Sequence, residues 1–233
     1  MYSRKLIRSF VVGAAAIVIA GGSYGIVSAT SSSSPAAASS ASAGGFRSGG
    51  GGSNARSGPA AGGAAGKVGS LSTAGFTITT SAGQKVTVKE ASSTTYQKQT
   101  GPASASAITT GESVLVLGTT SNTTITATQV IVEPAGSGSA ASSAAKVIPF
   151  QRGAPATSRQ VGQIPADFSQ GSGTIVSGTA ASKATAAALA AYPGAIVDRV
   201  VQLSNGGYNV HYIGVNWPHH VFLNQNFKII GAE

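Results

Sequence analysis

Large apolar side chains fall into three groups along the chain, separated by stretches of Gly, Ala and Ser. The first group lies near the N-terminus, the second spans roughly residues 66–133 and the third roughly residues 172–233. Each of the last two groups is close to the size at which a single core is only marginally stabilising. The pattern therefore predicts two small folded domains, an all-β domain and an α+β domain, joined by long linkers.

Alternation of apolar and polar positions predicts the all-β domain over residues 66–133. Short alternating runs occur at 76–79 and 86–88, and two longer ones at 114–118 and 125–132, with turn residues between them. Five or six strands of this length are expected to close into a small barrel, because closure removes the exposed edges of a sheet.

The order of motifs in this domain supports the barrel. F-x-I-x-T begins at Phe76, G-x-x-V-x-V at Gly83, G-E-x-V-x-V-x-G at Gly111 and I-x-A-x-x-V at Ile125. This order is similar to an uncharacterised small-barrel family of exported bacterial proteins, and it departs from that family mainly at 101–107. The resemblance implies an OB-like barrel and no activity.

Residues 178–192 are predicted to form one helix, with Thr179 as its N-cap and Pro193 after its end. Its buried stripe is expected to consist of Ala181, Thr185, Ala188, Leu189 and Tyr192, which recur at helical spacing. Most of these side chains are small, so the helix is expected to lie close on a sheet.

Four strands are predicted after the helix, at 197–203, 208–214, 220–223 and 227–230, with a hairpin turn at Asn205-Gly206-Gly207. The stretch KATAAALAAYPGAIVDRVVQLSNGGYNVHYIG, ending VFLNQNFKIIGAE, resembles a PepSY-type domain. The resemblance covers about the last quarter of the chain and implies one helix on an antiparallel sheet. It also implies a role in binding or inhibiting a peptidase in the cell envelope, without a catalytic residue of its own.

The N-terminus has the form of an export signal. Arg4, Lys5 and Arg8 precede the apolar run 10–20, and Val27-Ser28-Ala29 offers the small residues that signal peptidase requires. Cleavage after Ala29 is the preferred interpretation. The alternative is an uncleaved membrane anchor, because residues 10–29 are long enough to span a bilayer. Both place the rest of the chain outside the cytoplasm.

Two further segments are predicted to be disordered linkers, 30–65 and 134–171, because they contain few large apolar residues. The second contains two apolar islands that could dock on a neighbouring domain: Val147-Ile148-Pro149-Phe150, and Ile164-Pro165 with Phe168.

The charge and composition of the chain limit the classes of partner that it is expected to bind. The net charge is +9, but three of the positive charges lie in the signal and the others are scattered singly. Nucleic acid is therefore not expected as a partner, since its surface calls for clustered Lys and Arg. A protein or a wall polymer in the cell envelope is expected instead, with the membrane a partner only if residues 1–29 are retained.

No enzyme activity and no cofactor are expected. The chain has no cysteine, and none of its six acidic residues lies near another in a motif. The S-x-x-K match at 143–146 lacks its partner motifs, and Gly62 to Lys67 is one residue short of a phosphate-binding loop.

The three histidines could gather on one hairpin. If 215–218 is a four-residue loop, Ile213 faces His220 and His211 faces Phe222, so His211 and His220 lie diagonally on one face. A zinc site needs three or four protein ligands, and the sequence places no acid or cysteine nearby, so no metal is expected.

Trp217 is predicted to be the main contact residue, exposed at the tip of this loop, with Tyr212, Phe222, His211 and His220 completing a binding surface. The alternative is that its indole folds back over the edge of the sheet. The sequence thus favours a non-enzymatic exported protein of the cell envelope that acts as a binding or regulatory module. A structural or adhesive spacer of the cell wall is the alternative.

Overall fold

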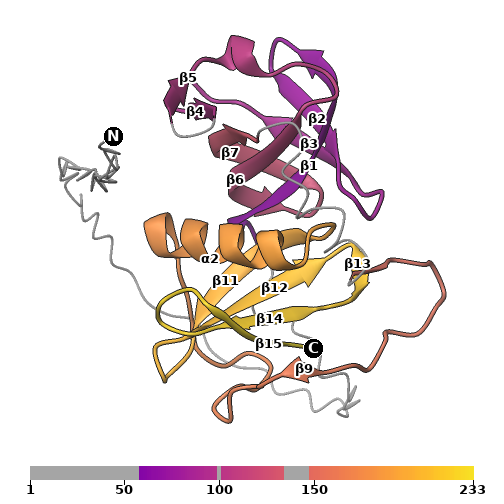
Figure 1. Ribbon diagram of the computed structural model, residues 1–233, viewed down its shortest axis with the longest axis vertical. Coiled ribbons are helices and arrows are strands. Elements are labelled where there is room, and N and C mark those ends of the chain that lie inside the picture. Colours follow the sequence, from indigo (N-terminus) through magenta and orange to yellow (C-terminus); the bar gives the residue numbers. More distant parts are fainter. Residues whose placement is uncertain (1–57, 99–100, 134–146) are drawn as a thin grey trace, which may run out of the picture. The chain divides into compact units, whose positions relative to one another are not determined.

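A closed five-stranded barrel forms the first part of the described chain. The structure, a computed structural model, describes residues 58–98, 101–133 and 147–233. The barrel strands are β1 (Ala60–Ser72), β2 (Gly75–Thr79), β3 (Lys85–Lys89), β6 (Ser113–Ser121) and β7 (Thr124–Val132). They pair in the order β1-β2-β3-β7-β6 and back to β1 (Figure 1), with only β3 and β7 parallel. The predicted small barrel is confirmed.

Three short elements extend the barrel: β4 (Thr95–Lys98), β5 (Gly101–Ala103) and the 3₁₀ helix η2 (Ala105–Ala107). Strand β4 runs parallel to the second half of β7 and forms a hairpin with β5. Strand β7 therefore pairs with β3 at its beginning and with β4 at its end, which lets a nine-residue strand close one whole side of the barrel.

The barrel interior is filled by the apolar half of the alternating pattern. The most deeply buried side chains are Ile78, Val86, Val88, Val114, Val116, Ile125 and Val130. In β3, for example, Val86 and Val88 are buried whereas Lys85, Thr87 and Lys89 are exposed. Alternation along the sequence thus determined which face of each strand points inward.

One helix packs on an antiparallel sheet in the second part. The helix is α2 (Gly178–Ala191), and the sheet strands are β11 (Ile196–Gln202), β12 (Tyr208–Ile213), β14 (His220–Leu223) and β15 (Ile229–Ala232). They lie in the order β11-β12-β14-β15. The N-cap is Ser177, with no side-chain hydrogen bond, so the prediction of Thr179 as the N-cap is wrong.

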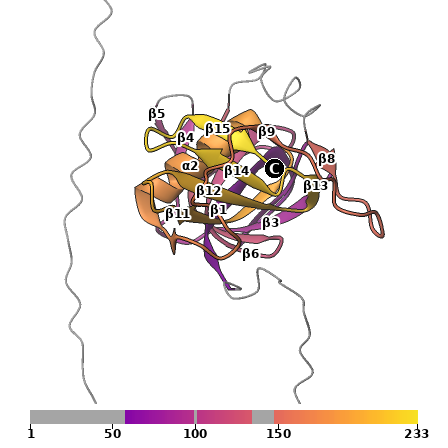
Figure 2. The ribbon, with the colours of Figure 1, turned by 90° about the horizontal axis from the view of Figure 1, so that it is seen from below.

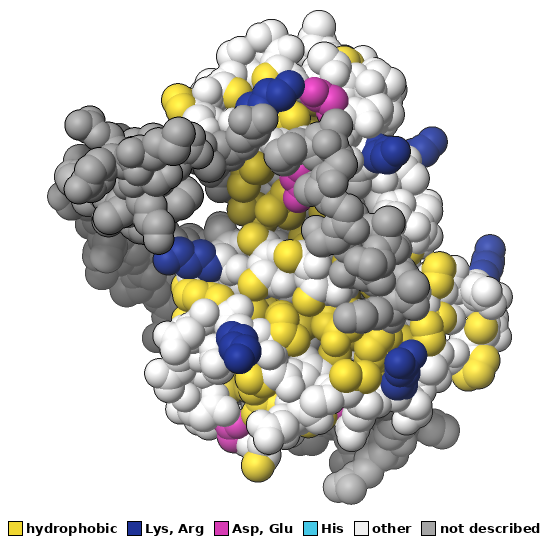
Figure 3. Space-filling model, in the orientation of Figure 1, with side chains coloured by type: hydrophobic (Ala, Val, Ile, Leu, Met, Phe, Trp, Pro, Cys, Tyr) yellow, Lys and Arg dark blue, Asp and Glu magenta, His cyan; other side chains and the backbone are white. Residues whose placement is uncertain are grey.

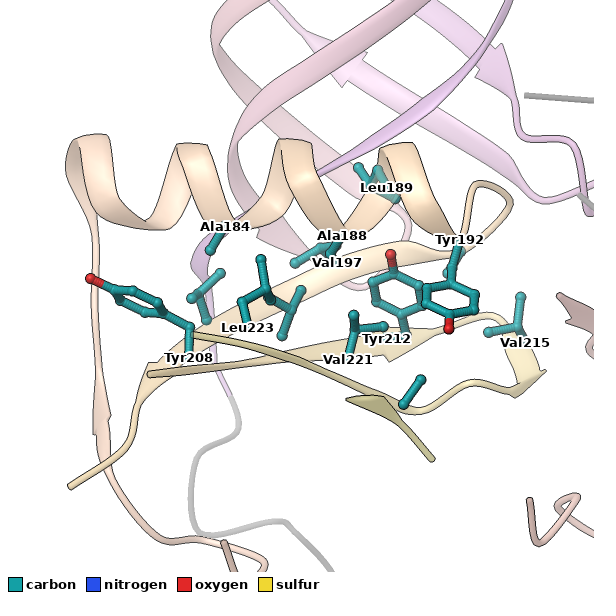
Figure 4. Packing of buried hydrophobic residues seen from close by; sticks show 14 of the residues in the cluster. Ala184, Ala188, Leu189, Tyr192, Val197, Tyr208, Tyr212, Val215, Val221 and Leu223 are labelled. Atoms are coloured by element: carbon teal, nitrogen blue, oxygen red, sulfur yellow. The ribbon is translucent and has the colours of Figure 1, made fainter. Parts of the chain in front are cut away.

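Small residues bring α2 close to this sheet. Ala184 and Ala188 are fully buried and face Val197, Val221 and Leu223 of the strands (Figure 4). Alanine adds little bulk between a helix and a sheet, so the two backbones approach closely and the larger strand side chains fill the layer between them.

Strand β1 joins the two parts. It pairs with β6 along residues 60–67 and also with β11, where Gly63 faces Val197 and Ala64 faces Ile196. The barrel strands and β11, β12, β14 and β15 therefore belong to one continuous sheet, and the described residues lie in a single compact unit, residues 50–233. The prediction that residues up to 65 form a disordered linker is wrong for 60–65, because these small residues are what a strand between close neighbours requires.

The described part of the second predicted linker, residues 147–171, lies on the folded unit instead of away from it. Strand β8 (Ile148–Pro149) pairs with β13 (Val215–Trp217), and the two lie side by side in Figure 2. Strand β9 (Val161–Gly162) pairs with β15, and β10 (Thr174–Ile175) pairs with β11. Val147 is buried in the core beneath α2, so this apolar island does dock. Residues 30–57 and 134–146 lie outside the described residues.

No helix within the described ranges is long and apolar enough to cross a membrane. The predicted signal or anchor, residues 1–29, lies outside those ranges.

A buried hydroxyl connects the β2–β3 turn to the corner after α2. Thr80 Oγ1 donates to the carbonyl oxygen of Gly194 at 2.6 Å and accepts from the Gln84 amide at 3.2 Å.

We expect Thr80→Val to lower the free energy of unfolding by about 1–2 kcal/mol, because the buried Gly194 carbonyl loses its donor. Urea unfolding measures this. Thr77→Val is the control, since the Thr77 hydroxyl bonds only exposed Ser70, and a loss as large in the control would contradict the prediction.

Candidate functional site

The face of the sheet opposite α2 carries the histidines. His211 pairs directly with His220, and Asn209 with Phe222, so the register predicted from a four-residue loop is shifted by two. The shift arises because residues 215–217 form strand β13. A shift of two preserves the faces of a strand. His211, His220 and Phe222 therefore still share one face, but the two histidines are opposite each other and not diagonal.

An aspartate that the sequence did not connect to the histidines completes a polar network. Asp198 Oδ1 lies 2.5 Å from His211 Nδ1, and Asp198 Oδ2 lies 3.5 Å from Nη1 of Arg199. The register between β11 and β12 shifts between Val197 and Arg199, so Asp198 occupies a bulge and turns toward the histidine face. The expectation that no acid lies near the histidines is wrong.

His220 is the most perturbed group of this network. Its Nδ1 lies 3.1 Å from Nδ2 and 3.2 Å from Oδ1 of Asn209, and its ring centroid lies 5.0 Å from that of His211. Burial, followed by the neighbouring His211, His219 and Arg199, lowers the pKa of His220 from 6.5 to about 3, against the opposite effect of Asp198. His220 is therefore neutral near pH 7.

Aromatic rings cover the network. The Phe168 ring lies 4.7 Å from that of Phe222, edge to face, and 5.1 Å from that of His220. Phe222 is completely buried by this packing. Phe222 was predicted as a contact residue, but it is an interior residue of the histidine face.

Trp217 is also an interior residue. Its side chain is 1% exposed, its Nε1 donates to the Arg159 carbonyl oxygen at 2.8 Å, and its ring packs edge to face on Tyr192 at 5.6 Å. The predicted exposed indole at a loop tip is therefore wrong. The alternative, in which the indole folds back, is closer to what the structure contains, because the indole bonds the Arg159 backbone and the Arg159 guanidinium lies over the ring.

Tyr212 lies on the α2 face, as predicted, and is completely buried. Its side chain and that of Tyr192 point into the layer between helix and sheet (Figure 4). Burial raises the pKa of the Tyr212 hydroxyl well above 10. Of the five residues predicted to form a binding surface, only His211 and His220 line a surface depression through their side chains.

That depression is a groove of about 630 Å³ beside the histidines. Its lining includes Phe150, Arg159 and Gln160 on one side and His211, His219 and Glu233 on the other. Phe150 is 55% exposed, and the Arg159 guanidinium lies 4.8 Å from the centre of the Trp217 ring. The groove thus combines an exposed aromatic ring, a cation placed over an indole ring and three histidine side chains.

The possible metal ligands of this site can be set against what a metal site requires, which is three or four protein ligands. Among the residues that the structure describes, no group of three His, Cys, Asp or Glu side chains is placed to hold one. Asp198 already bonds His211 and Arg199, which leaves the two imidazoles of His211 and His220 on this face. What the arrangement can do chemically is bind a partner by apolar and charged contacts.

Comparison of the chain with protein-family models, curated proteins and solved structures found no match in any of the three. On the face shown in Figure 3, Lys and Arg side chains are spread singly among apolar and neutral ones.

Proposed function

We propose that this protein is a non-enzymatic, exported protein of the cell envelope whose groove at Phe150 and Arg159 binds and regulates an envelope peptidase. The observation that carries the proposal is the 630 Å³ groove, which pairs an exposed aromatic side chain with an oriented guanidinium. Aromatic and Arg side chains are the residue types that dominate the energetics of protein interfaces.

The fold is compatible with this role. The sequence resemblance to PepSY-type domains, with one helix on an antiparallel sheet, supports a module that acts by contact. The barrel order β1-β2-β3-β7-β6 fits the OB-like barrel that the motifs predicted. The barrel strands carry few aromatic residues, so we assign recognition to the groove and a supporting role to the barrel.

A structural spacer of the cell wall is the second candidate. It is favoured by the continuous sheet that joins the barrel to the second part through β1. A unit joined in this way, after the Gly-, Ala- and Ser-rich sequence 30–57, suits a spacer module in the cell wall.

Photo-cross-linking in the producing cells separates the two candidates. A photoreactive amino acid is placed at Phe150, which is 55% exposed in the groove, or at Leu71, which is 51% exposed on the barrel, as the matched control. We expect the Phe150 position to give a covalent adduct with an envelope peptidase, identified by mass spectrometry, and the Leu71 position to give at least tenfold less.

Equal adducts at the two positions, or none at Phe150, would contradict a role for the groove. Adducts with wall polymer alone, at either position, would support the spacer and reject the peptidase.

A further inference from the structure

The buried Trp217 ring holds Arg159 in place at the groove. The backbone carbonyl oxygen of Arg159 accepts from Trp217 Nε1 at 2.8 Å, and the guanidinium of the same residue lies 4.8 Å from the centre of the indole ring. Trp217 is itself 1% exposed and packs edge to face on Tyr192. Both the backbone and the side chain of Arg159 are thus attached to an interior residue. A side chain held in this way has less conformational freedom to lose when it binds a ligand.

The hydrogen-bond donors of this guanidinium are not used by an acid within the described ranges. The ion pairs there join Lys98 to Glu112, and Asp198 to its two neighbours on the histidine face. Glu233 lines the same groove, but its carboxylate accepts from the Gln160 side chain at 3.2 Å. The indole attracts the cation through its ring face and leaves the N–H groups to other acceptors. A guanidinium presents these N–H groups as a planar fork that matches a carboxylate.

The balance of charge in the groove favours a ligand with one negative charge. Among the described residues of the lining there is one arginine, Arg159, one glutamate, Glu233, and no lysine. A wall polymer with a phosphate in every repeat would bring several negative charges against Glu233. It would also make little use of Phe150, a large apolar side chain that is 55% exposed. A protein segment can supply both an acidic and an apolar side chain.

Strand β13 sets the spacing between the two contact points. Pro149 faces Val215 in the pairing of β8 with β13, and Phe150 directly follows Pro149. Arg159 is attached at Trp217, further along the same strand. The two points are therefore two to three residues apart, or roughly 7–10 Å at the rise of a strand. An extended peptide covers this distance with two or three residues of its own.

We propose that the groove binds an extended segment of a protein partner in which one Asp or Glu lies two or three residues from a large apolar residue. The carboxylate accepts hydrogen bonds from the Arg159 guanidinium, and the apolar side chain packs on Phe150. This recognition rests on the proposed function, because it specifies what the same groove binds in its partner. An amide in place of the acid would lose the charge-assisted hydrogen bonds.

Binding of blocked peptides to the purified full-length protein tests this recognition. The peptides place Leu and Glu two or three residues apart, in either order, in a background of Gly and Ser, and each has a counterpart with Gln in place of Glu. Calorimetry measures the affinities. The fluorescence of Trp217, the only tryptophan of the chain, reports binding beside Arg159. We expect a Glu peptide to bind with a Kd below about 1 mM, and at least tenfold more tightly than its Gln counterpart.

Substitutions of Arg159 assign this preference to the guanidinium. Arg159→Gln is expected to lower the ratio of Glu to Gln affinities to about one, and Arg159→Lys to lower it partly, because lysine keeps the charge without the fork. Arg152→Gln is the matched control, since Arg152 is exposed and does not line the groove, and it is expected to keep the wild-type ratio. Phe150→Ala is expected to weaken both members of each pair and to leave their ratio unchanged.

Absence of binding by every peptide, or affinities that are equal within every pair, would overturn the proposal. So would a preference for Glu that Arg159→Gln leaves intact. Tighter binding of poly(glycerol phosphate) than of any Glu peptide would mean that the groove recognises a phosphate polymer, and would overturn it too. Peptide binding needs no peptidase. The preference for an acid and the cross-link from Phe150 to a peptidase can therefore fail separately.

Discussion

Replacing Gly62 or Gly63 by alanine is expected to lower the free energy of unfolding by about 3 kcal/mol or more. A Cβ atom at Gly62 would lie 2.1 Å from the carbonyl oxygen of Val197, and one at Gly63 would lie 2.2 Å from that of Val116. Both obstacles are backbone atoms of paired strands. They can move away only by breaking the pairing of β1 with β6 or β11.

Urea unfolding followed by circular dichroism measures this effect. Gly69→Ala is the matched control in the same strand. Gly69 is exposed, and its Cβ would lie 2.9 Å from the side-chain oxygen of Thr77, which can move away. We expect the control to change stability by less than about 1 kcal/mol. Equal losses in Gly62→Ala and Gly69→Ala would mean that β1 does not lie between β6 and β11 as described.

Trp217→Ala is expected to lower the free energy of unfolding by about 3–5 kcal/mol, the usual cost of removing a buried tryptophan. The change removes the ring that packs on Tyr192 and supports the Arg159 guanidinium, and it leaves the Arg159 carbonyl without its donor. A side chain at an exposed loop tip would cost far less, so the measurement separates the structure directly from the interpretation based on sequence.

Thermal and urea unfolding of Trp217→Ala are compared with those of Phe150→Ala. Phe150 directly follows β8, the strand that pairs with β13, but it is 55% exposed, so its removal is expected to cost less than about 1 kcal/mol. Trp217→Phe is expected to fall between the two, because it keeps an aromatic ring but not the indole N–H. An unfolding midpoint of Trp217→Ala equal to that of the wild type would contradict the buried position.

The second of these expectations concerns a residue that supports the wall of the groove. Arg159, which lines the groove, rests on the Trp217 ring, so a loss of the indole is expected to disturb the groove through its wall. A weaker interaction of Trp217→Ala with a partner would therefore not show that Trp217 touches that partner. Substitution of Phe150, which supports little of the core, is the better probe of binding.

The sequence alone determined the local structure of this protein. Helix α2 covers Gly178–Ala191 where 178–192 was predicted, and β14 has its predicted bounds, 220–223. The alternation of apolar and polar residues in β3 and β12 correctly predicted which side chains of these strands point into the core. These features depend on apolar positions that recur every 3.6 residues in a helix and every 2 residues in a strand. Such repeats are visible within one segment, without knowledge of the rest of the chain.

Only the tertiary structure decided what surrounds each segment. Residues 60–65 became a strand because β6 pairs along this segment and β11 pairs with Gly63 and Ala64. At Gly62 and Gly63 the backbone carbonyl groups of these neighbours leave no room for a Cβ atom. Trp217 became interior because Arg159 and Tyr192 pack against its ring. Asp198 met His211 because a bulge turned it toward that face. Each result depends on contacts between residues far apart in the sequence. The free energy of such a contact depends on both partners, and a local sequence pattern contains only one of them.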